Sequence, residues 1–366
     1  MIKLMGVLMA LGWLGSSSLV AAENKVIMQG WAEGGFSRSW QNGAAIENEN
    51  QFLVDNLSWK ITFPVSDKTS VFLHNAFALT GGNTAAIAVA GSGVTPIAGQ
   101  GTSTYGAGFN TSAYYSAATS HIGRFYFTNL AGYIQHKCSE NVTTWFGHFR
   151  MPFGMETLTE RFSMPTYYFT DTFNTAHAYG WEYDLGAKMA ISNLGPGTLE
   201  FAVADGRFTD RYYPASALRY MFENKVGTGS ITPVASVFTG RWGSGPGDVG
   251  FSAGAASKFG KLAANVEFLY ASQNLTFATD ARTKAWSFYL EPTYTVDGIG
   301  DLSMKAEYSS QTVATAPAVT DINLGLGVTH SYGDGLRVRA TYAHRGLKGD
   351  RTNHINDFRI LVGTQW

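Results

Sequence analysis

The ten residues DFRILVGTQW (Asp357–Trp366) alternate between apolar and polar side chains. The even-numbered residues form a mostly apolar set: Phe358, Ile360, Val362, Thr364 and Trp366. The odd-numbered set contains Asp357, Arg359 and Gln365. A period of two predicts a β-strand, because successive side chains of a strand point to opposite faces. The large aromatic residue at the end of the apolar face predicts that something other than water covers that face.

The same alternation recurs in the segments that precede this stretch. Apolar residues occupy even positions in the segments starting at Leu262, Trp286, Leu302, Ile322 and Leu336. Several apolar faces carry aromatic residues toward their ends (Trp286, Tyr294, Tyr308 and Tyr342), as the two interfaces of a membrane require of a transmembrane barrel. A water-soluble β-sandwich also alternates, but the odd faces here hold Glu, Lys and Arg beside Gly and Ser. That composition favours a water-filled lumen over a packed core.

Composition agrees with an all-β membrane protein. The chain has 42 Gly, 24 Phe, 18 Tyr and 9 Trp, while only 14% of its residues are charged. Its formal net charge of −1 implies no nucleic-acid partner. The single cysteine, Cys138, cannot form an internal disulfide.

The first residues, MIKLMGVLMALGWLGSSSLVAA, have the order of a secretory signal peptide. Lys3 precedes an apolar run, and Val20 and Ala22 are placed for cleavage before Glu23. The apolar run is shorter than the roughly 20 residues that a membrane-spanning helix needs. We therefore expect residues 1–22 to be a cleaved signal peptide and residues 23–366 to be one domain outside the cytoplasm.

Short turns alternate with longer segments rich in Gly, Ser and Thr, as in an up-and-down barrel with short periplasmic turns and long extracellular loops. Fourteen strands are evident between Val26 and Trp366, and a further hairpin, Ala217–Asn224 with Ile231–Arg241, gives sixteen. We predict an all-β, antiparallel transmembrane barrel of sixteen strands. The alternative is fourteen strands, if the stretch after Gly206 is one long loop.

The last strand also resembles the signal that such barrels present to the assembly machinery, with Phe358 and Trp366 as its aromatic residues.

The stretch WFGHFRMPFGMETLTERF (Trp145–Phe162) carries a local motif. It resembles the G-x-F-x-x-P-[FI]-G-x-E segment of porins of the phosphate-selective O/P type and related barrel porins, here Gly147, Phe149, Pro152, Phe153, Gly154 and Glu156. The resemblance implies that residues 151–178 fold inward as a loop that narrows the pore. Its charged candidates are Arg150, Glu156, Glu160 and Arg161. The lysine-rich lining of a phosphate-specific pore is not evident, so the resemblance supports a porin but not phosphate selectivity.

Charged residues on the odd faces are candidates to line the pore, where they sort ions and orient solutes. The basic candidates are Arg337, Arg339, Arg359, Arg345 and Lys305, and the acidic candidates beside them are Glu267, Glu291 and Glu307. On the strand that follows the proposed inward loop, the candidates on the lumen face are the even-numbered Glu182, Asp184 and Lys188. Basic strands opposite an acidic sector would set up a transverse field across the narrowest point.

Two strings look catalytic, GPGDVG (Gly245–Gly250) and GFSAG (Gly250–Gly254), but no helix follows to hold a pyrophosphate or a nucleophile. The eight histidines show no metal-ligand spacing, so we expect no cofactor, no metal and no enzymatic activity.

The sequence thus predicts a porin of the Gram-negative outer membrane for passive diffusion of small hydrophilic solutes and ions. The alternatives are an anion- or phosphate-preferring porin, a barrel enzyme, and a plugged structural or adhesion barrel. The expected partners are outer-membrane lipid and lipopolysaccharide, the barrel-assembly machinery, the diffusing solutes, and two further copies in a homotrimer.

Overall fold

The computed structural model describes residues 25–42, 49–80, 124–158, 166, 183–205, 214–240, 247–274, 282–313, 318–349 and 354–365. The strands are β1 (Ile27–Asn42), β2 (Glu49–Pro64), β3 (Thr69–Thr80), β4 (Arg124–Lys137), β5 (Val142–Arg150), β6 (Tyr183–Leu194), β7 (Gly197–Ala204), β8 (Ala215–Phe222), β9 (Asn224–Val226), β10 (Gly229–Gly240), β11 (Asp248–Phe259), β12 (Leu262–Asn274), β13 (Arg282–Val296), β14 (Gly300–Val313), β15 (Val319–Ser331), β16 (Leu336–Gly349) and β17 (His354–Gln365). Within these ranges the only helical elements are single 3₁₀ turns, Glu156–Leu158 and Gly333–Gly335.

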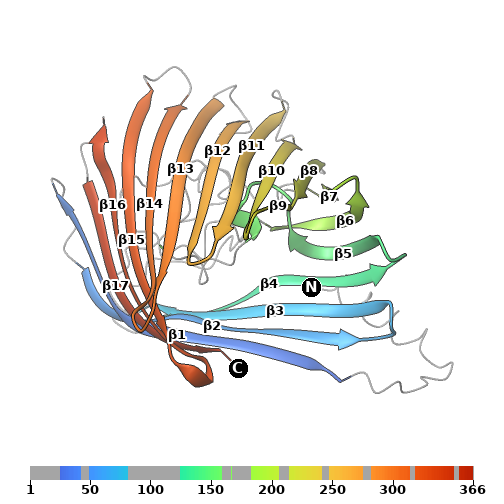
Figure 1. Cartoon of the computed structure of the whole chain (residues 1–366), viewed down its shortest axis with the longest axis horizontal. Coiled ribbons are helices and arrows are strands. Elements are labelled where there is room, and N and C mark those ends of the chain that lie inside the picture. Colours follow the sequence, from blue (N-terminus) through green and yellow to red (C-terminus); the bar gives the residue numbers. More distant parts are fainter. Residues whose placement is uncertain are drawn as a thin grey trace.

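Each strand pairs antiparallel with its neighbours, and β1 pairs with both β2 and β17, which closes the sheet into a barrel. The short β9 follows β8 after one residue, Glu223, and both pair with β10, so they form one interrupted barrel strand. The barrel therefore has sixteen strands, as the sequence predicts, and the fourteen-strand alternative is wrong. The sheet curves from the upright strands β11–β16 to the nearly horizontal strands β1–β5 (Figure 1).

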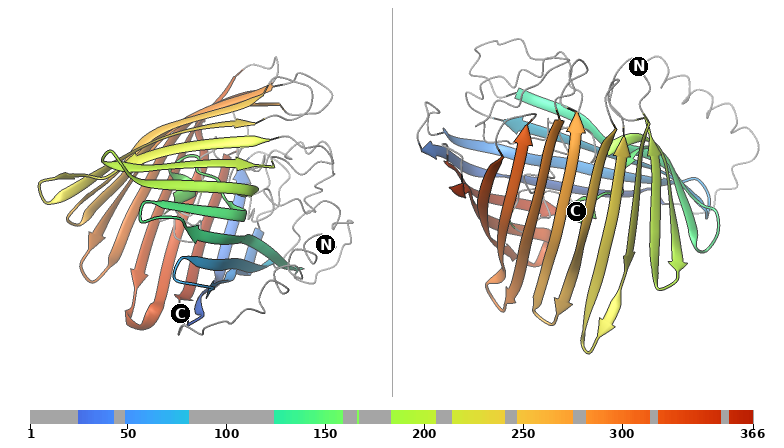
Figure 2. Two further views of the ribbon diagram at one scale, coloured as in Figure 1. Left: turned by 90° about the vertical axis from the view of Figure 1, so that its right-hand side faces the viewer. Right: turned by 90° about the horizontal axis from the view of Figure 1, so that it is seen from above.

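Short turns join alternate strand pairs at one end of the barrel, and Figure 2 shows the tight turns of the yellow to orange strands together at that end. They include Gly195–Pro196, Gly227–Thr228 and Gly260–Lys261. At the same end Trp31, near the start of β1, lies opposite Gln365, the last residue of β17. Both ends of the described chain therefore lie on the short-turn side.

Exposure alternates along the strands. On β12 and β13 the even-numbered Phe268, Phe288 and Leu290 are exposed, whereas the odd-numbered Glu267 and Tyr289 are buried. A sheet closed on itself has one enclosed face, so the buried set faces the interior and the exposed apolar set faces outward.

The parity of the inward residues changes at the two-residue turn before β12. Phe251 pairs with Tyr270 across this turn, and directly paired residues share a face. Even-numbered residues such as Ser252 on β11 therefore point inward, whereas odd-numbered residues do so on β12. The even-outward rule of the sequence holds from β12 to β17, where each register pairs even with even numbers. No helix within the described ranges is long and apolar enough to cross a membrane.

Candidate functional site in the barrel lumen

The interior face carries most of the charged residues singled out in the sequence. Glu267, Glu291, Glu307, Asp184, Lys305, Arg339 and Arg359 are buried inside the barrel. Lys188 and Arg337 are half-buried on β6 and β16. Arg345 lies on β16, but its side chain falls outside the described part, as do Glu182, Glu160 and Arg161.

The segment that follows β5 enters the interior. Residues 151–157 are all buried, and Met151 and Phe153 are at most 1% exposed. Of the loop predicted over residues 151–178, the described residues are 151–158 and Thr166. We call residues 151–158 the inward segment.

Consecutive residues of the inward segment bind strands on the opposite wall. The Gly154 N–H donates to Ser236 Oγ on β10 at 2.8 Å, and the Met155 N–H donates to Glu267 Oε1 on β12 at 2.7 Å. Lys305 on β14 donates to the Glu156 carboxylate, and both side chains are almost fully buried. Thr166 Oγ1 donates to Glu291 Oε1 on β13 at 2.7 Å.

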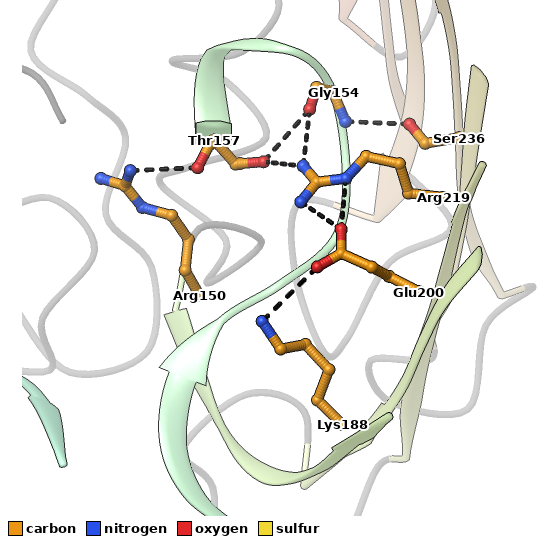
Figure 3. Close-up of polar contacts among 7 residues, drawn as sticks. All are labelled: Arg150, Gly154, Thr157, Lys188, Glu200, Arg219 and Ser236. Carbon is orange, nitrogen blue, oxygen red and sulfur yellow. Dashed lines mark hydrogen bonds and ion pairs between the residues drawn. The ribbon is translucent and has the colours of Figure 1, made fainter. Parts of the chain in front are cut away.

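A charged network on β6, β7 and β8 holds the near side of the inward segment (Figure 3). Arg219 on β8 donates through Nη1 to the Gly154 carbonyl oxygen at 3.1 Å and to Thr157 Oγ1 at 2.7 Å. Its Nε donates to Glu200 Oε2 at 2.7 Å, and Glu200 also lies 3.8 Å from Lys188 Nζ. Arg150 Nη1 donates to the Thr157 carbonyl oxygen at 3.0 Å. A guanidinium supplies donors in a fixed fork, so Arg219 binds the strand wall and the segment at once.

Packing around the inward segment depends on small residues in the wall. Ala202 and Ala204 on β7, with Ala215 and Ala217 on β8, leave room for larger side chains. That room is filled by Phe149, Met151 and Phe153, and Phe153 meets Phe238 edge-on at 6.0 Å between ring centroids. Burying these apolar side chains stabilises the segment against the wall.

Five of the six residues of the local motif, all except Pro152, have a role that the structure explains. Gly147 and Gly154 have φ of 134° and 72°, which disfavour residues with a Cβ atom. A Cβ on Gly147 would lie 2.3 Å from the Gly132 carbonyl oxygen. Phe149 and Phe153 are buried, and Glu156 binds Lys305. The motif therefore encodes the turn from β5 into the interior.

Glu267 is the acceptor at the centre of the opposite wall. Besides the hydrogen bond from Met155, its carboxylate accepts hydrogen bonds from Ser252 Oγ at 2.5 Å and from Tyr289 Oη at 3.1 Å. Ser252 belongs to the GFSAG string, and its described bond is to this carboxylate. Within the described ranges, no group of three His, Cys, Asp or Glu is placed to hold a metal ion.

A second charged group lies where the barrel closes. The carboxylate of Glu33 on β1 accepts hydrogen bonds from two arginines of β16, from Arg339 Nη2 at 2.5 Å and from Arg337 Nη2 at 3.5 Å. Arg359 on β17 donates to Asp357 through Nε at 3.0 Å and through Nη2 at 2.8 Å. The three arginines are thus accompanied by carboxylates on their own wall, in addition to the acidic residues on β12–β14.

Four charged residues outside the set predicted from the sequence take part in these contacts: Glu33, Glu200, Arg219 and Asp357. Asp357 and Glu200 could have been found from the alternation of their strands. Arg219 could not, because its inward neighbours on β8 are small alanines and give no polar face.

The closed barrel, its apolar outer face and its charged interior define an antiparallel sixteen-stranded β-barrel of the outer-membrane type. No family model and no curated protein matches the sequence. Solved structures of outer-membrane proteins do match in fold. The chain is 12% identical to the trimer form of OmpT, an outer membrane protein of Vibrio cholerae, with a TM-score of 0.59, covering 94% of this chain and 99% of that one.

Two further matches are channels. The outer membrane channel DcaP of Acinetobacter baumannii is 11% identical with a TM-score of 0.58, covering 93% of this chain and 97% of that one. An anion-selective porin from Comamonas acidovorans is 12% identical with a TM-score of 0.56, covering 94% of this chain and 100% of that one. At such identities the likeness establishes the fold.

Proposed function

We propose that the chain is a porin of the Gram-negative outer membrane through which small hydrophilic solutes and ions diffuse passively, without chemistry or a cofactor. The observation that carries the proposal is the pairing of an apolar exterior with charged side chains inside a closed barrel. Charges such as Lys188 and Arg337, which are half-buried on the interior face, are costly in an apolar core but suit the wall of a hydrated passage.

The inward segment supports a pore with a narrow zone rather than a uniform tube. It reaches from β5 to β10, β12 and β14 and is held by Arg219 on β8. We propose that it and the residues up to 178 set the pore's narrowest cross-section.

Placement in the membrane follows from the same faces. Exposed outward residues such as Phe146, Phe288 and Val362 suit contact with outer-membrane lipid and lipopolysaccharide. We propose export through the signal peptide 1–22 and recognition by the barrel-assembly machinery through Phe358 and Trp366. The trimer form of the Vibrio cholerae protein supports a homotrimer for this chain as well.

An anion preference is the second candidate. Arg337, Arg339 and Arg359 gather on the adjacent strands β16 and β17, with Glu33 and Asp357 among their carboxylate partners. The fold neighbour described as an anion-selective porin agrees with this candidate.

Liposome swelling tests the proposal. Vesicles containing the purified protein should swell in isotonic solutions of small sugars, and the rate should fall steeply as the sugar becomes larger. A plugged structural or adhesion barrel predicts no swelling above that of protein-free vesicles for any solute, and that result would reject the proposal.

A further inference from the structure

Six interior residues form a band that the diffusion of ions does not require. Each of the strands β1–β6 contributes one member: Trp31, Lys60, Phe72, Tyr133, Trp145 and Lys188. We call this set the aromatic band.

Hydrogen-bond register places the aromatic band on one face of the sheet. Lys60 lies opposite His74, two residues from Phe72, which lies opposite Tyr133. Trp145 lies opposite Lys188. On the same face Ser58, His74 and Ala131 are at most 4% exposed, whereas Phe63 and Phe146 on the opposite face are 37% and 54% exposed. The aromatic band therefore faces the interior.

The band has a repeating order of contacts. Lys60 Nζ lies 4.8 Å from the centre of the Trp31 ring, and Lys188 Nζ lies 4.4 Å from the Trp145 ring. Between these lysine–tryptophan pairs, Phe72 and Tyr133 stack at 4.7 Å with planes 16° apart. Aromatic surface and positive charge thus follow one another along the wall.

The six side chains are half-buried, unlike Phe149 and Phe153 of the inward segment, which are 1% exposed. Each residue of the band keeps some exposure on the interior face, although Tyr133 and Trp145 also pack against the buried cluster that contains Phe153.

The β6 end of the band lies beside the inward segment. Lys188 contacts Glu200, and Glu200 binds Arg219, which holds Gly154 and Thr157. A solute at this end of the band would therefore rest next to the proposed narrow zone.

We propose that the aromatic band is a binding site for aromatic carboxylates on their way through the pore. A flat ring stacks on the exposed aromatic faces, and the carboxylate binds a lysine ammonium at a neighbouring ring. Neutral sugars would contact only the ring faces, and inorganic anions would bind only the ammonium groups. The inference rests on the proposed porin function and names a solute class for it.

The test is block of single-channel current by benzoate, with acetate and benzyl alcohol as probes that carry only the charge or only the ring. Benzoate should reduce the current at concentrations about tenfold below either comparison compound, because both contacts act together. Phe72→Leu, Trp145→Leu and Lys188→Gln should each raise the half-blocking concentration of benzoate by about three- to tenfold. Phe146→Leu, one position from Trp145 on the outward face of β5, is the matched control and should leave it unchanged.

Equal block by benzoate and acetate, or unchanged block in both Phe72→Leu and Trp145→Leu, would overturn the site. Calorimetric titration of benzoate into detergent-solubilised protein separates the two proposals. Benzoate binding that depends on Trp145 in a protein without conductance would retain the site and reject the porin. Normal conductance with no such binding would reject the site alone.

Discussion

The backbone N–H of Met155 donates to the carboxylate of Glu267 at 2.7 Å, joining residues that are 112 positions apart in the chain. This bond fixes the inward segment to the far wall. Ser252 and Tyr289 donate to the same carboxylate, so Glu267 satisfies three buried donors.

Replacing Glu267 with Leu should loosen the inward segment, because each buried donor left unsatisfied costs about 1–3 kcal/mol. We expect lower thermal stability in detergent and larger fluctuations of the open-channel current. Glu140→Leu, in an exposed short turn, is the control. Unchanged current noise in Glu267→Leu would show that this bond does not hold the segment.

Arg219→Lys separates the hydrogen bonds by which Arg219 holds the inward segment from the effect of its positive charge. Lysine keeps the positive charge but lacks the fork that binds Glu200, Gly154 and Thr157 together. We expect greater current noise with nearly unchanged ion selectivity, measured in the same bilayer. A large change in selectivity with quiet current would mean that Arg219 acts through its charge and not by holding the segment.

The sequence predicts the barrel well where one face is apolar throughout. The apolar even face is unbroken over Leu262–Tyr270 and again over Trp286–Val296, where one side of the sheet points outward and the other faces the charged interior. Upstream the prediction weakens, since the turn before β12 reverses the parity and the alanines of β8 hide the inward face.

The site is only partly predictable for a related reason. Glu267 and Lys305 follow from strand alternation alone. Their bonds to Met155 and Glu156 depend on the path of a segment that crosses the interior, and no local period encodes that path.

Glu33→Gln should shift the channel toward anions. The substitution removes the carboxylate that binds Arg339 and Arg337 and leaves both positive charges inside the barrel. The reversal potential across a KCl gradient measures the shift, which should be larger at 0.01 M than at 1 M salt because screening lengths fall from about 30 Å to 3 Å. Replacing Arg337, Arg339 and Arg359 together with Ser should shift selectivity the opposite way. If both variants keep the wild-type potential, another part of the pore sets the selectivity.

Leu290→Arg should destabilise the barrel in lipid by about 2–4 kcal/mol if its outward position lies near the bilayer midplane. Tyr294→Arg is the matched control. Tyr294 lies on the same face of β13, four residues nearer the short turn, where the destabilisation by an arginine falls to about 0–1 kcal/mol. Urea unfolding in lipid vesicles measures both. Equal, small effects would contradict contact between this face and lipid.

Deleting Trp366 should lower the yield of assembled protein in the outer membrane, because the recognition strand then lacks its terminal aromatic residue. Quantitative blotting of outer-membrane fractions, with Gln365→Asn as the control, measures the yield. Wild-type amounts of assembled protein after the deletion would remove Trp366 from the assembly signal.

Single-channel recording in planar lipid bilayers measures most directly whether the barrel is an open pore. Addition of purified protein should give discrete, long-lived current steps, with conductance that rises with KCl concentration as expected for a water-filled passage. Folded, inserted protein that gives no current steps above the bare bilayer would contradict an open pore.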